Sequence, residues 1–187
     1  MIFKQVEEIL NGTKTQTRPV CNLIEMGVHY PGISPIDEPF ANNTVHVNGR
    51  IKWQVGRTYA VVPKWGARAV WWRRFPGGEI QTTVDPDCPE SIRRYDDAML
   101  KHDGWQPLRI EITAIRRERV NEISEEDARA EGYPYEWPYN AFDPHLVKIP
   151  PCPVFWYREL WDSINKRKGI RFSDAPLCWV IEFRVAE

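Results

Sequence analysis

The sequence predicts an α+β fold in which helices and strands mix without regular alternation. Alternation of apolar and polar residues indicates strands at 108–113 and 179–185, and helical periodicity indicates helices at 3–10, 124–131 and 155–165. These segments do not follow one another as repeated βαβ units, which would favour a parallel sheet. With 187 residues, 42% of them hydrophobic, the chain is long enough for one domain with a substantial core.

The chain opens with an amphipathic helix and a polar extended run. Apolar residues recur at helical spacing at Phe3, Val6, Ile9 and Leu10. Gly12 suits the position after a helix C-terminus, where φ is positive. Residues 13–18 then supply two cations and three threonine hydroxyls, and Pro19 biases Arg18 away from helix. Taken alone, the run is typical of a solvated edge strand.

The central part is predicted to hold short strands separated by turns. Residues 21–49 are rich in Pro, Gly and Asn and are expected to be irregular. Strands are expected at 51–55, 59–62 and 69–72, a hairpin turn at 75–79, and a helix at 89–102 with Ile92, Tyr95 and Met99 on one face. Residues 75–105 are expected to be an insertion lying on the main sheet, because about 30 residues cannot bury an independent core.

The C-terminal half carries the clearest elements. Leu108, Ile110 and Ile112 alternate with polar residues, as in a half-buried strand. Ser124 and Asp127 are typical of a helix start, and Gly132 of its end. A loop is expected at 133–153. The last helix is predicted to bury a stripe made up of Tyr157, Leu160, Trp161 and Ile164. The final strand is predicted to bury one face, made up of Trp179, Ile181, Phe183 and Val185.

Three blocks of sequence resemble ASCH domains, which are relatives of the PUA RNA-binding fold. The segment Ile9 to Arg18 follows the pattern I-L-x-G-x-K-T-x-T-R, and residues 123–132 read ISEEDARAEG. The third block joins FWYRELWDSIN at 155–165 to WVIEF at 179–183. In this order the blocks resemble the longer ASCH proteins often carried by phages and prophages. The resemblance implies a single domain over 1–187 with a small, partly open PUA-like β-barrel, flanking short helices and the insertion.

The resemblance also implies catalytic residues. In ASCH amidohydrolases that remove the acetyl group from N4-acetylcytidine, catalysis is attributed to a Thr nucleophile, a Lys three residues before it, and a Glu in the short helix. By motif position these are Thr17, Lys14 and Glu131. A lysine can take the threonine proton only if its pKa falls toward neutrality. In a regular strand residues 14 and 17 point to opposite faces, so an irregularity would be needed to bring them together.

The chain departs from the family at one site. ASCH domains usually continue into an acidic V-x-E motif, whereas this chain has Val62-Pro63-Lys64. A role tied to that carboxylate is therefore not expected here.

Two other functions remain open from the sequence, since ASCH members are also credited with RNA binding and ribonuclease activity. A non-catalytic reader would bind a modified or flipped-out base through Lys14, Arg18 and an aromatic such as Trp156 or Tyr157. In a ribonuclease, Lys14 and Arg18 would steady the phosphorane and Glu131 would act as base.

Charge favours a pocket for one base. The net charge of −1 argues against a protein that follows a long phosphate backbone, so the expected partner is a nucleoside or single-stranded RNA. A phosphate beside that base could be held by one of three basic clusters: Arg68, Arg73 and Arg74; Arg116, Arg117 and Arg119; or Lys166, Arg167 and Lys168.

The remaining composition excludes several classes of protein. No apolar run approaches the ~20 residues that span a bilayer, and the first ten residues carry two glutamates where a signal peptide is apolar, so a cytoplasmic protein is expected. The four cysteines form no C-x-x-C pair, so neither a zinc knuckle nor a disulfide framework is indicated. Cys88 would need the chain to fold back to share a metal with Asp85, Asp87 and His102. No metal or cofactor is expected, and the oligomeric state is left open.

Overall fold

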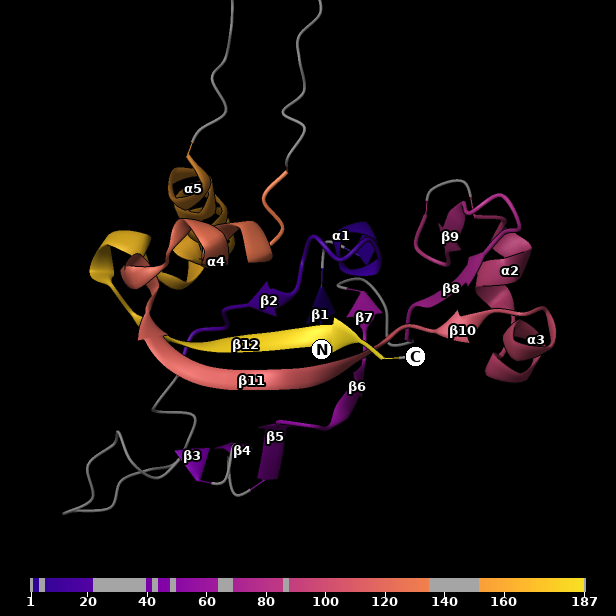
Figure 1. Ribbon diagram of the computed structural model, residues 1–187, viewed down its shortest axis with the longest axis horizontal. Helices are drawn as coiled ribbons and strands as arrows, with labels where there is room; N and C mark the ends of the chain where they lie inside the picture. Colours follow the sequence, from indigo (N-terminus) through magenta and orange to yellow (C-terminus); the bar gives the residue numbers. More distant parts are fainter. Residues whose placement is uncertain are drawn as a thin grey trace, which may run out of the picture.

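A strongly curved antiparallel sheet forms the centre of the molecule (Figure 1). The computed structural model describes residues 2–3, 6–21, 40–41, 44–47, 50–63, 69–85, 88–134 and 152–186. The central sheet has the strand order β2-β12-β11-β6, with β2 at Gln16–Thr17, β12 at Leu177–Val185, β11 at Arg109–Arg119 and β6 at Thr58–Ala60. The predicted α+β class is confirmed. β2 is an edge strand as the polar run indicated, but the run is not solvated, because Lys14, Gln16 and Arg18 are buried.

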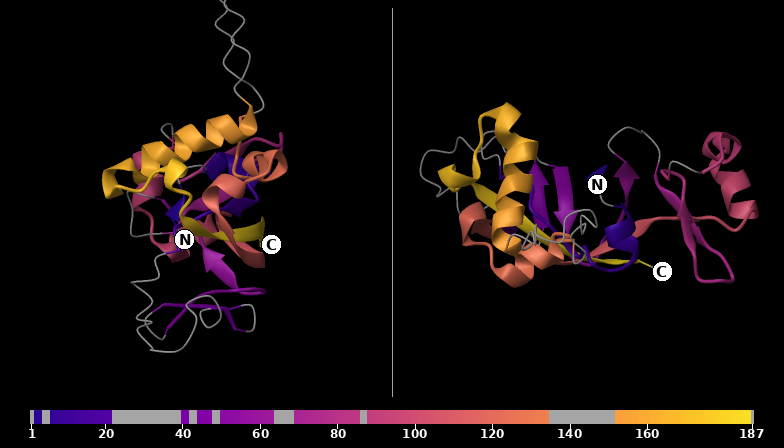
Figure 2. Two further views of the ribbon diagram at one scale, coloured as in Figure 1. Left: turned by 90° about the vertical axis from the view of Figure 1, so that its left-hand side faces the viewer. Right: turned by 90° about the horizontal axis from the view of Figure 1, so that it is seen from above.

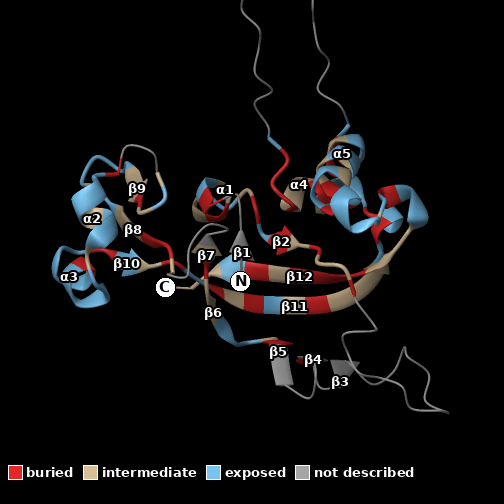
Figure 3. Cartoon of the chain, turned by 180° about the vertical axis from the view of Figure 1, so that it is seen from behind, coloured by how far each residue is buried: buried red, intermediate tan, exposed pale blue. Residues whose placement is uncertain are grey.

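The long pair β11 and β12 gives the sheet its curvature. Ile112 lies opposite Phe183, Ile115 lies opposite Ile181, and the register shifts between Ile112 and Ala114. An irregularity of this kind bends a strand and increases its twist. Both faces of β12 are covered, because Cys178, Trp179, Val180 and Ile181 are all buried in succession, and Figure 3 draws much of this strand in the colour of buried residues.

Helices cover one face of this pair. The helix α4 (Glu125–Ala130) and the longer α5 (Pro153–Asn165) lie over the end where β11 leads into the short 3-10 turn η1 (Val120–Glu122). The 3-10 turns η2 (Lys166–Lys168) and η3 (Phe172–Asp174) connect α5 to β12. Tyr157 and Trp161 of α5 pack with Cys178 of β12 and Ala128 of α4 in one buried cluster.

Short elements complete the remaining sides. The helix α1 (Val6–Leu10) follows β1 (Ile2–Phe3), which pairs in parallel with β7 (Val62–Pro63). On the other face of the sheet lies a small sheet of β3 (Phe40–Ala41), β4 (Thr44–Val47) and β5 (Arg50–Gln54). Val45 and Trp53 of this sheet pack against Ile112 and Trp179.

A separate three-stranded sheet projects from one end of the curved sheet (Figure 2). Its strands are β8 (Trp71–Arg74), β9 (Ile80–Thr82) and β10 (Gln106–Pro107), and it carries α2 (Glu90–Arg94) and α3 (Asp97–His102). Trp71, Cys88, Leu100 and Trp105 form a buried cluster of their own. The region expected as an insertion at 75–105 thus belongs to a larger unit that begins with β8.

Several predicted elements differ in detail from the structure. Residues 21–49 were expected to be irregular, but β3 and β4 lie within them, because the short Thr44–Val47 alternation is flanked by asparagines that favour turns. The predicted strand at 59–62 is divided between β6 and β7 at Val61, whose N–H donates to the carbonyl of Leu108 (3.0 Å). Phe3 lies in β1 rather than in the first helix.

The predicted helix at 89–102 is two helices. Tyr95 is extended, with ψ at 142°, and the carboxylate of Asp96 accepts from the N–H of Met99 (2.8 Å) as a new N-cap. This break rotates the second helix, so that Leu100 is buried and Met99 is 51% exposed.

Exposure also corrects the stripe expected on the last helix. Tyr157 and Trp161 are buried as predicted, but Ile164 is 44% exposed because the buried stripe of α5 continues through Asn165 and leaves Ile164 beside it. In the loop expected at 133–153, residues 135–151 lie outside the described part of the chain. Among the helices that the structure describes, none is both long and apolar enough to cross a membrane.

Candidate functional site

The candidate site lies where the N-terminal polar run meets the end of α4. Lys14 and Glu131 form an isolated antiparallel β-bridge, and the N–H of Thr15 donates to the carbonyl of Ala130 (2.9 Å). The same run joins the central sheet, because Thr17 of β2 pairs with Ile181 of β12. Segments from the beginning, middle and end of the sequence therefore converge here, as Figure 1 shows.

A buried ion pair stands at the centre of the site. Lys14 Nζ lies 3.1 Å from Glu131 Oε2 and donates to the Glu131 backbone carbonyl (2.6 Å). The two side chains are only 6% and 4% exposed. Arg18 Nη1 approaches the other carboxylate oxygen, Glu131 Oε1, at 3.4 Å, and the Arg18 side chain is fully buried. One carboxylate thus faces two cations away from water.

The local sequence explains how these cations reach the interior. Gly12 adopts φ of 80° after α1, which turns the chain into the polar run. From there burial alternates, with Lys14, Gln16 and Arg18 buried and Thr15 exposed. Since successive side chains of an extended chain point to opposite faces, the two cations share the face that meets α4.

The helix α4 presents Glu131 to this face. The Ser124 hydroxyl accepts from the N–H of Asp127 (3.1 Å) and caps the helix, as the sequence predicts. Glu131 is the C-cap residue, and its N–H donates to the Asp127 carbonyl (3.0 Å). Gly132 follows with φ of 95°, a conformation that glycine tolerates without strain and that ends the helix. The Ser124 cap and the helix end at Gly132 together fix the position of Glu131.

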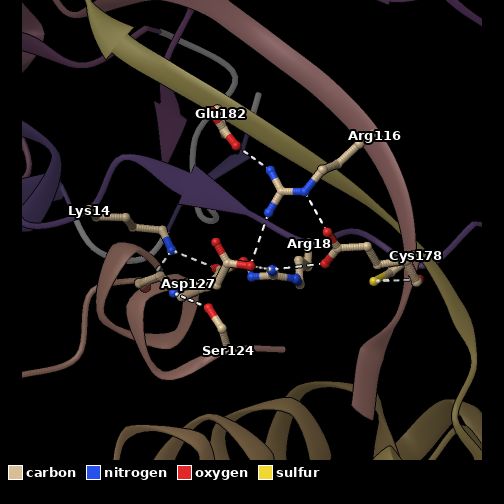
Figure 4. A network of polar contacts seen from close by, with 9 residues as sticks. Lys14, Arg18, Arg116, Ser124, Asp127, Cys178 and Glu182 are labelled. Atoms are coloured by element: carbon tan, nitrogen blue, oxygen red, sulfur yellow. Dashed lines mark hydrogen bonds and ion pairs between the residues drawn. The ribbon is translucent and has the colours of Figure 1, made fainter. Parts of the chain in front are cut away.

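Asp127 links the buried pair to a second, more exposed group of charges (Figure 4). Its Oδ2 accepts from Arg18 Nη2 (2.7 Å) and from Arg116 Nη2 (2.9 Å). In the amide orientation that its neighbours require, Gln16 donates to Asp127 Oδ1 (3.1 Å) and accepts from Arg18. Asp127 therefore holds α4 to both the polar run and β11.

The outer charges lie on the two long strands. Arg116 pairs with Glu118 at 2.5 Å and also with Glu182. Glu118 in turn accepts from Arg18 Nη2 at 3.3 Å. These outer side chains are between 23% and 40% exposed, counting Asp127 with them. We call the whole set the charge network: Lys14, Arg18, Arg116, Glu118, Asp127, Glu131 and Glu182.

The charge network contains more carboxylates than cations. Its three cations are each in an ion pair, and four carboxylates surround them. Burial raises the pKa of Glu131 above its ordinary value, and the nearby charges of Lys14 and Arg18 oppose that rise. Every cation here already has an acidic partner, so little positive charge is left for a phosphate.

Aromatic and thiol groups close the inner side of the site. Arg18 lies over the ring of Tyr157 at 5.9 Å, within cation–π range. Burial, followed by the charge of Glu131, holds the pKa of Tyr157 well above its ordinary value. Burial also raises the pKa of Cys178 to about 12, so this thiol stays protonated. Tyr157 and Cys178 therefore line the site in their neutral forms and do not act as acids or bases at neutral pH.

Trp156 lies on the more open side. It is half-buried and meets Tyr133 edge to face, with ring centroids 5.5 Å apart. Tyr133 follows Glu131 by two residues, so Trp156 is connected to the site through this ring. Of the two aromatics that the sequence indicated, Tyr157 is packed inside and Trp156 has surface left for a ligand.

Thr17, the predicted nucleophile, lies apart from the other predicted catalytic residues. The alternating burial places it on the face of the run opposite Lys14 and Arg18. Its hydroxyl makes no hydrogen bond with any residue that the structure describes, Lys14 and Glu131 included. The structure therefore brings Lys14, Arg18 and Glu131 together but leaves Thr17 outside this contact.

Sequence reasoning missed the outer half of the charge network. Arg116 and Glu118 are two residues apart on β11, the spacing of neighbours on one strand face. Asp127 was recognised only as part of a helix start. Their roles depend on which elements meet, and a single sequence does not show this.

No metal-binding group is apparent among the described residues, where no three His, Cys, Asp or Glu side chains gather suitably. Asp85, considered as a ligand beside Cys88, instead accepts from the N–H and hydroxyl of Thr82 (2.6 and 2.5 Å). Asp87 lies outside the described residues.

Comparison with known proteins gave two structures of similar arrangement. A crystal structure of an ASCH domain from Lactobacillus crispatus matches 96% of this chain and 68% of that one, with 16% identity and a TM-score of 0.46. An Enterococcus faecalis protein assigned to family DUF984 matches 96% and 65%, with 12% identity and a TM-score of 0.43. The chain thus spans about two thirds of the length of each. No protein-family model and no curated protein matches the sequence.

Proposed function

We propose that this chain is an ASCH-type protein that binds one nucleobase, as a nucleoside or within single-stranded RNA, at the Lys14–Glu131 site. The observation that carries the proposal is the buried contact of Lys14 and Arg18 with Glu131. Buried ion pairs are poor sources of stability, because desolvation offsets most of their attraction. Ionisable groups with perturbed pKa values are instead typical of functional sites.

The chemistry of the pair suits the edge of a base. A glutamate oxygen accepts from an exocyclic amine such as cytosine N4, and the adjacent cations donate to ring nitrogens or carbonyl oxygens. Trp156 offers a half-buried ring on which an unpaired base could stack. In this assignment Lys14, Arg18 and Glu131 read the base, Trp156 stacks on it, and Tyr157 supports Arg18 from inside.

The charge balance of the site argues against the ribonuclease alternative. Stabilising a phosphorane requires cations that are free to follow the developing negative charge. Lys14 and Arg18 are instead paired with Glu131, and Arg18 also with Asp127. A phosphate would have to displace carboxylates from both cations.

Amide hydrolysis is the second candidate, because the contact between Lys14 and Glu131 offers a route to a neutral lysine. Burial favours the protonated form of Glu131, and its Oε2 lies 3.1 Å from Lys14 Nζ, so this oxygen is the acceptor placed to take a proton from the amine. The neutral amine would then take the proton of Thr17, whose oxygen would attack the acyl carbon. The bond from that carbon to N4 would break as Glu131 gives its proton to the departing amine, and water would then hydrolyse the acyl-threonine. The attack needs Thr17 to come within reach of Lys14 when substrate binds.

Calorimetric titration with cytidine, N4-acetylcytidine and a single-stranded RNA octamer tests the proposal. Glu131→Gln should lose most of the nucleoside affinity, whereas Glu126→Gln, an exposed glutamate of the same helix, should leave it unchanged. Absence of binding by the wild type, or equal binding by Glu131→Gln, would contradict the proposal.

Chromatography of the N4-acetylcytidine mixture separates reader from hydrolase. Release of cytidine that is lost in Thr17→Val and retained in Thr15→Val would establish the hydrolase. Binding without turnover would indicate a non-catalytic protein that only binds the base.

A further inference from the structure

Of the three basic clusters, one is fully engaged within the protein and a second is engaged through one arginine. In the cluster at 116–119, Arg116 pairs with carboxylates, Arg117 lies over the ring of Trp179 at 5.5 Å, and Arg119 donates to the Ala175 carbonyl (3.1 Å). In the cluster at 68–74, Arg73 lies over the ring of Trp105 at 4.7 Å, Arg74 is exposed, and Arg68 lies outside the described residues. The engaged arginines mainly stabilise the fold.

The third cluster is different. Lys166, Arg167 and Lys168 form the turn η2 directly after α5, and all three are exposed. Their side chains make no hydrogen bond or ion pair with any part of the chain that the structure describes. The nearby acids are engaged elsewhere: Asp162 accepts from the N–H of Phe172 (2.7 Å) and Asp174 from that of Arg171 (2.9 Å).

Helix capping does not account for this concentration of charge. One cation at a helix C-terminus contributes about 0.3–1 kcal/mol, and its effect is confined to the last turn. Three adjacent cations repel one another, in a chain whose net charge is −1. An anionic partner would relieve that repulsion, which points to a binding surface.

The helix α5 connects this surface to the candidate site. Tyr157 in the first half of α5 contacts Arg18. Lys166 directly follows the end of α5 and is nine residues after Tyr157. At 1.5 Å per residue the two positions are about 13 Å apart along the axis. Figure 2 shows α5 lying across one face of the curved sheet.

We propose that η2 binds the phosphates of single-stranded RNA whose recognised base occupies the Lys14–Glu131 site. This inference rests on the proposed function and extends it, because it makes a polynucleotide rather than a free nucleoside the preferred ligand. Lys166, Arg167 and Lys168 contact phosphates a few nucleotides from the base, and the base contacts themselves are unchanged.

A matched pair of double variants tests the inference. Arg167→Gln/Lys168→Gln removes one arginine and one lysine from η2, and Arg94→Gln/Lys101→Gln removes the same charges from the exposed surface of α2 and α3. Affinities for an RNA octamer and for cytidine are measured across a range of salt concentrations.

The η2 variant should bind the octamer on the order of tenfold more weakly, and its log–log salt slope should shrink by about 1.4, or roughly 0.7 for each of two phosphates. Its cytidine affinity and all affinities of the α2/α3 variant should match the wild type. Equal losses in both variants, or none in either, overturn the inference. Wild-type protein that binds cytidine but gains nothing from the octamer overturns it while the proposed function stands. Wild type that binds neither ligand overturns both.

Discussion

Lys14 and Glu131 are 117 residues apart in the sequence, yet their side chains form a buried ion pair at 3.1 Å. Their backbones also pair as an isolated β-bridge. The contact therefore does not depend on one flexible side chain reaching another. It is fixed by the way the polar run docks against the end of α4.

Asp127 is expected to position Glu131, because it ties α4 to Arg18 and Arg116. Asp127→Asn keeps the shape and removes the charge that both arginines share. We expect the free energy of unfolding to fall by about 1.5–3 kcal/mol, as for a hydrogen bond to a charged group, and base affinity to fall with it. Urea denaturation and nucleoside titration measure the two effects.

Glu125→Gln is the control for that change, since Glu125 forms an exposed ion pair with Arg129 on the same helix. Such pairs contribute about 0–1 kcal/mol. Similar losses in the two variants would show that any charge removed from α4 has this effect, and Asp127 would lose its assigned role.

The raised pKa of Glu131 predicts a pH-dependent stability difference. Burial raises the pKa in the folded protein, so the protonated carboxyl is favoured there relative to the unfolded chain. This contribution is complete below the unfolded pKa of about 4.5 and is lost as pH rises through the folded pKa. The unfolding free energy of wild type minus that of Glu131→Gln should therefore decrease from pH 4.5 upward.

Urea denaturation at intervals from pH 4 to pH 8 measures this difference, since titration of the other groups largely cancels between the two proteins. A difference that grows with pH would mean that Lys14 and Arg18 outweigh burial and lower the pKa of Glu131 instead.

Lys14→Arg separates binding from chemistry at the same position. Arginine keeps the positive charge opposite Glu131 but does not give up a proton at working pH. We expect the variant to retain most of the base affinity of the wild type. Any deacetylation of N4-acetylcytidine should be abolished, as measured by chromatography. Turnover that persists in this variant would remove Lys14 from the mechanism.

The sequence was sufficient to predict the buried part of the site, formed by Lys14, Arg18 and Glu131. The motif at residues 9–18 and the block at 123–132 predict that Lys14, Arg18 and Glu131 act together, and the structure brings all three into contact. Gly12 and Gly132 have the positive φ that their positions required. The glycine conformations are local, so short segments predict them, whereas the contact of Lys14 and Arg18 with Glu131 was implied by the resemblance to ASCH domains.

Features that depend on distant contacts could not be predicted in this way. Glu118 and Arg116 join the site because β11 passes beside α4, and pairing of β11 with β12 brings Glu182 to Arg116. The apolar residues keep helical spacing across Asp96, so the sequence showed no sign of a break there. In the structure the Asp96 side chain caps a new helix instead of continuing the first one. Thr17 is a further example, because the motif identifies this residue but does not predict that its side chain lies on the face opposite Lys14.

The most direct test of the central claim observes the Lys14 ammonium while a nucleoside binds. Side-chain ammonium NMR of 15N-lysine-labelled protein, assigned with Lys14→Arg, follows Lys14 during a cytidine titration, with the exposed Lys101 as internal reference. If the base occupies the Lys14–Glu131 site, the Lys14 signal shifts and saturates with the calorimetric affinity, and Lys101 does not move. Saturable binding that leaves the Lys14 signal unchanged would place the base elsewhere and contradict the account.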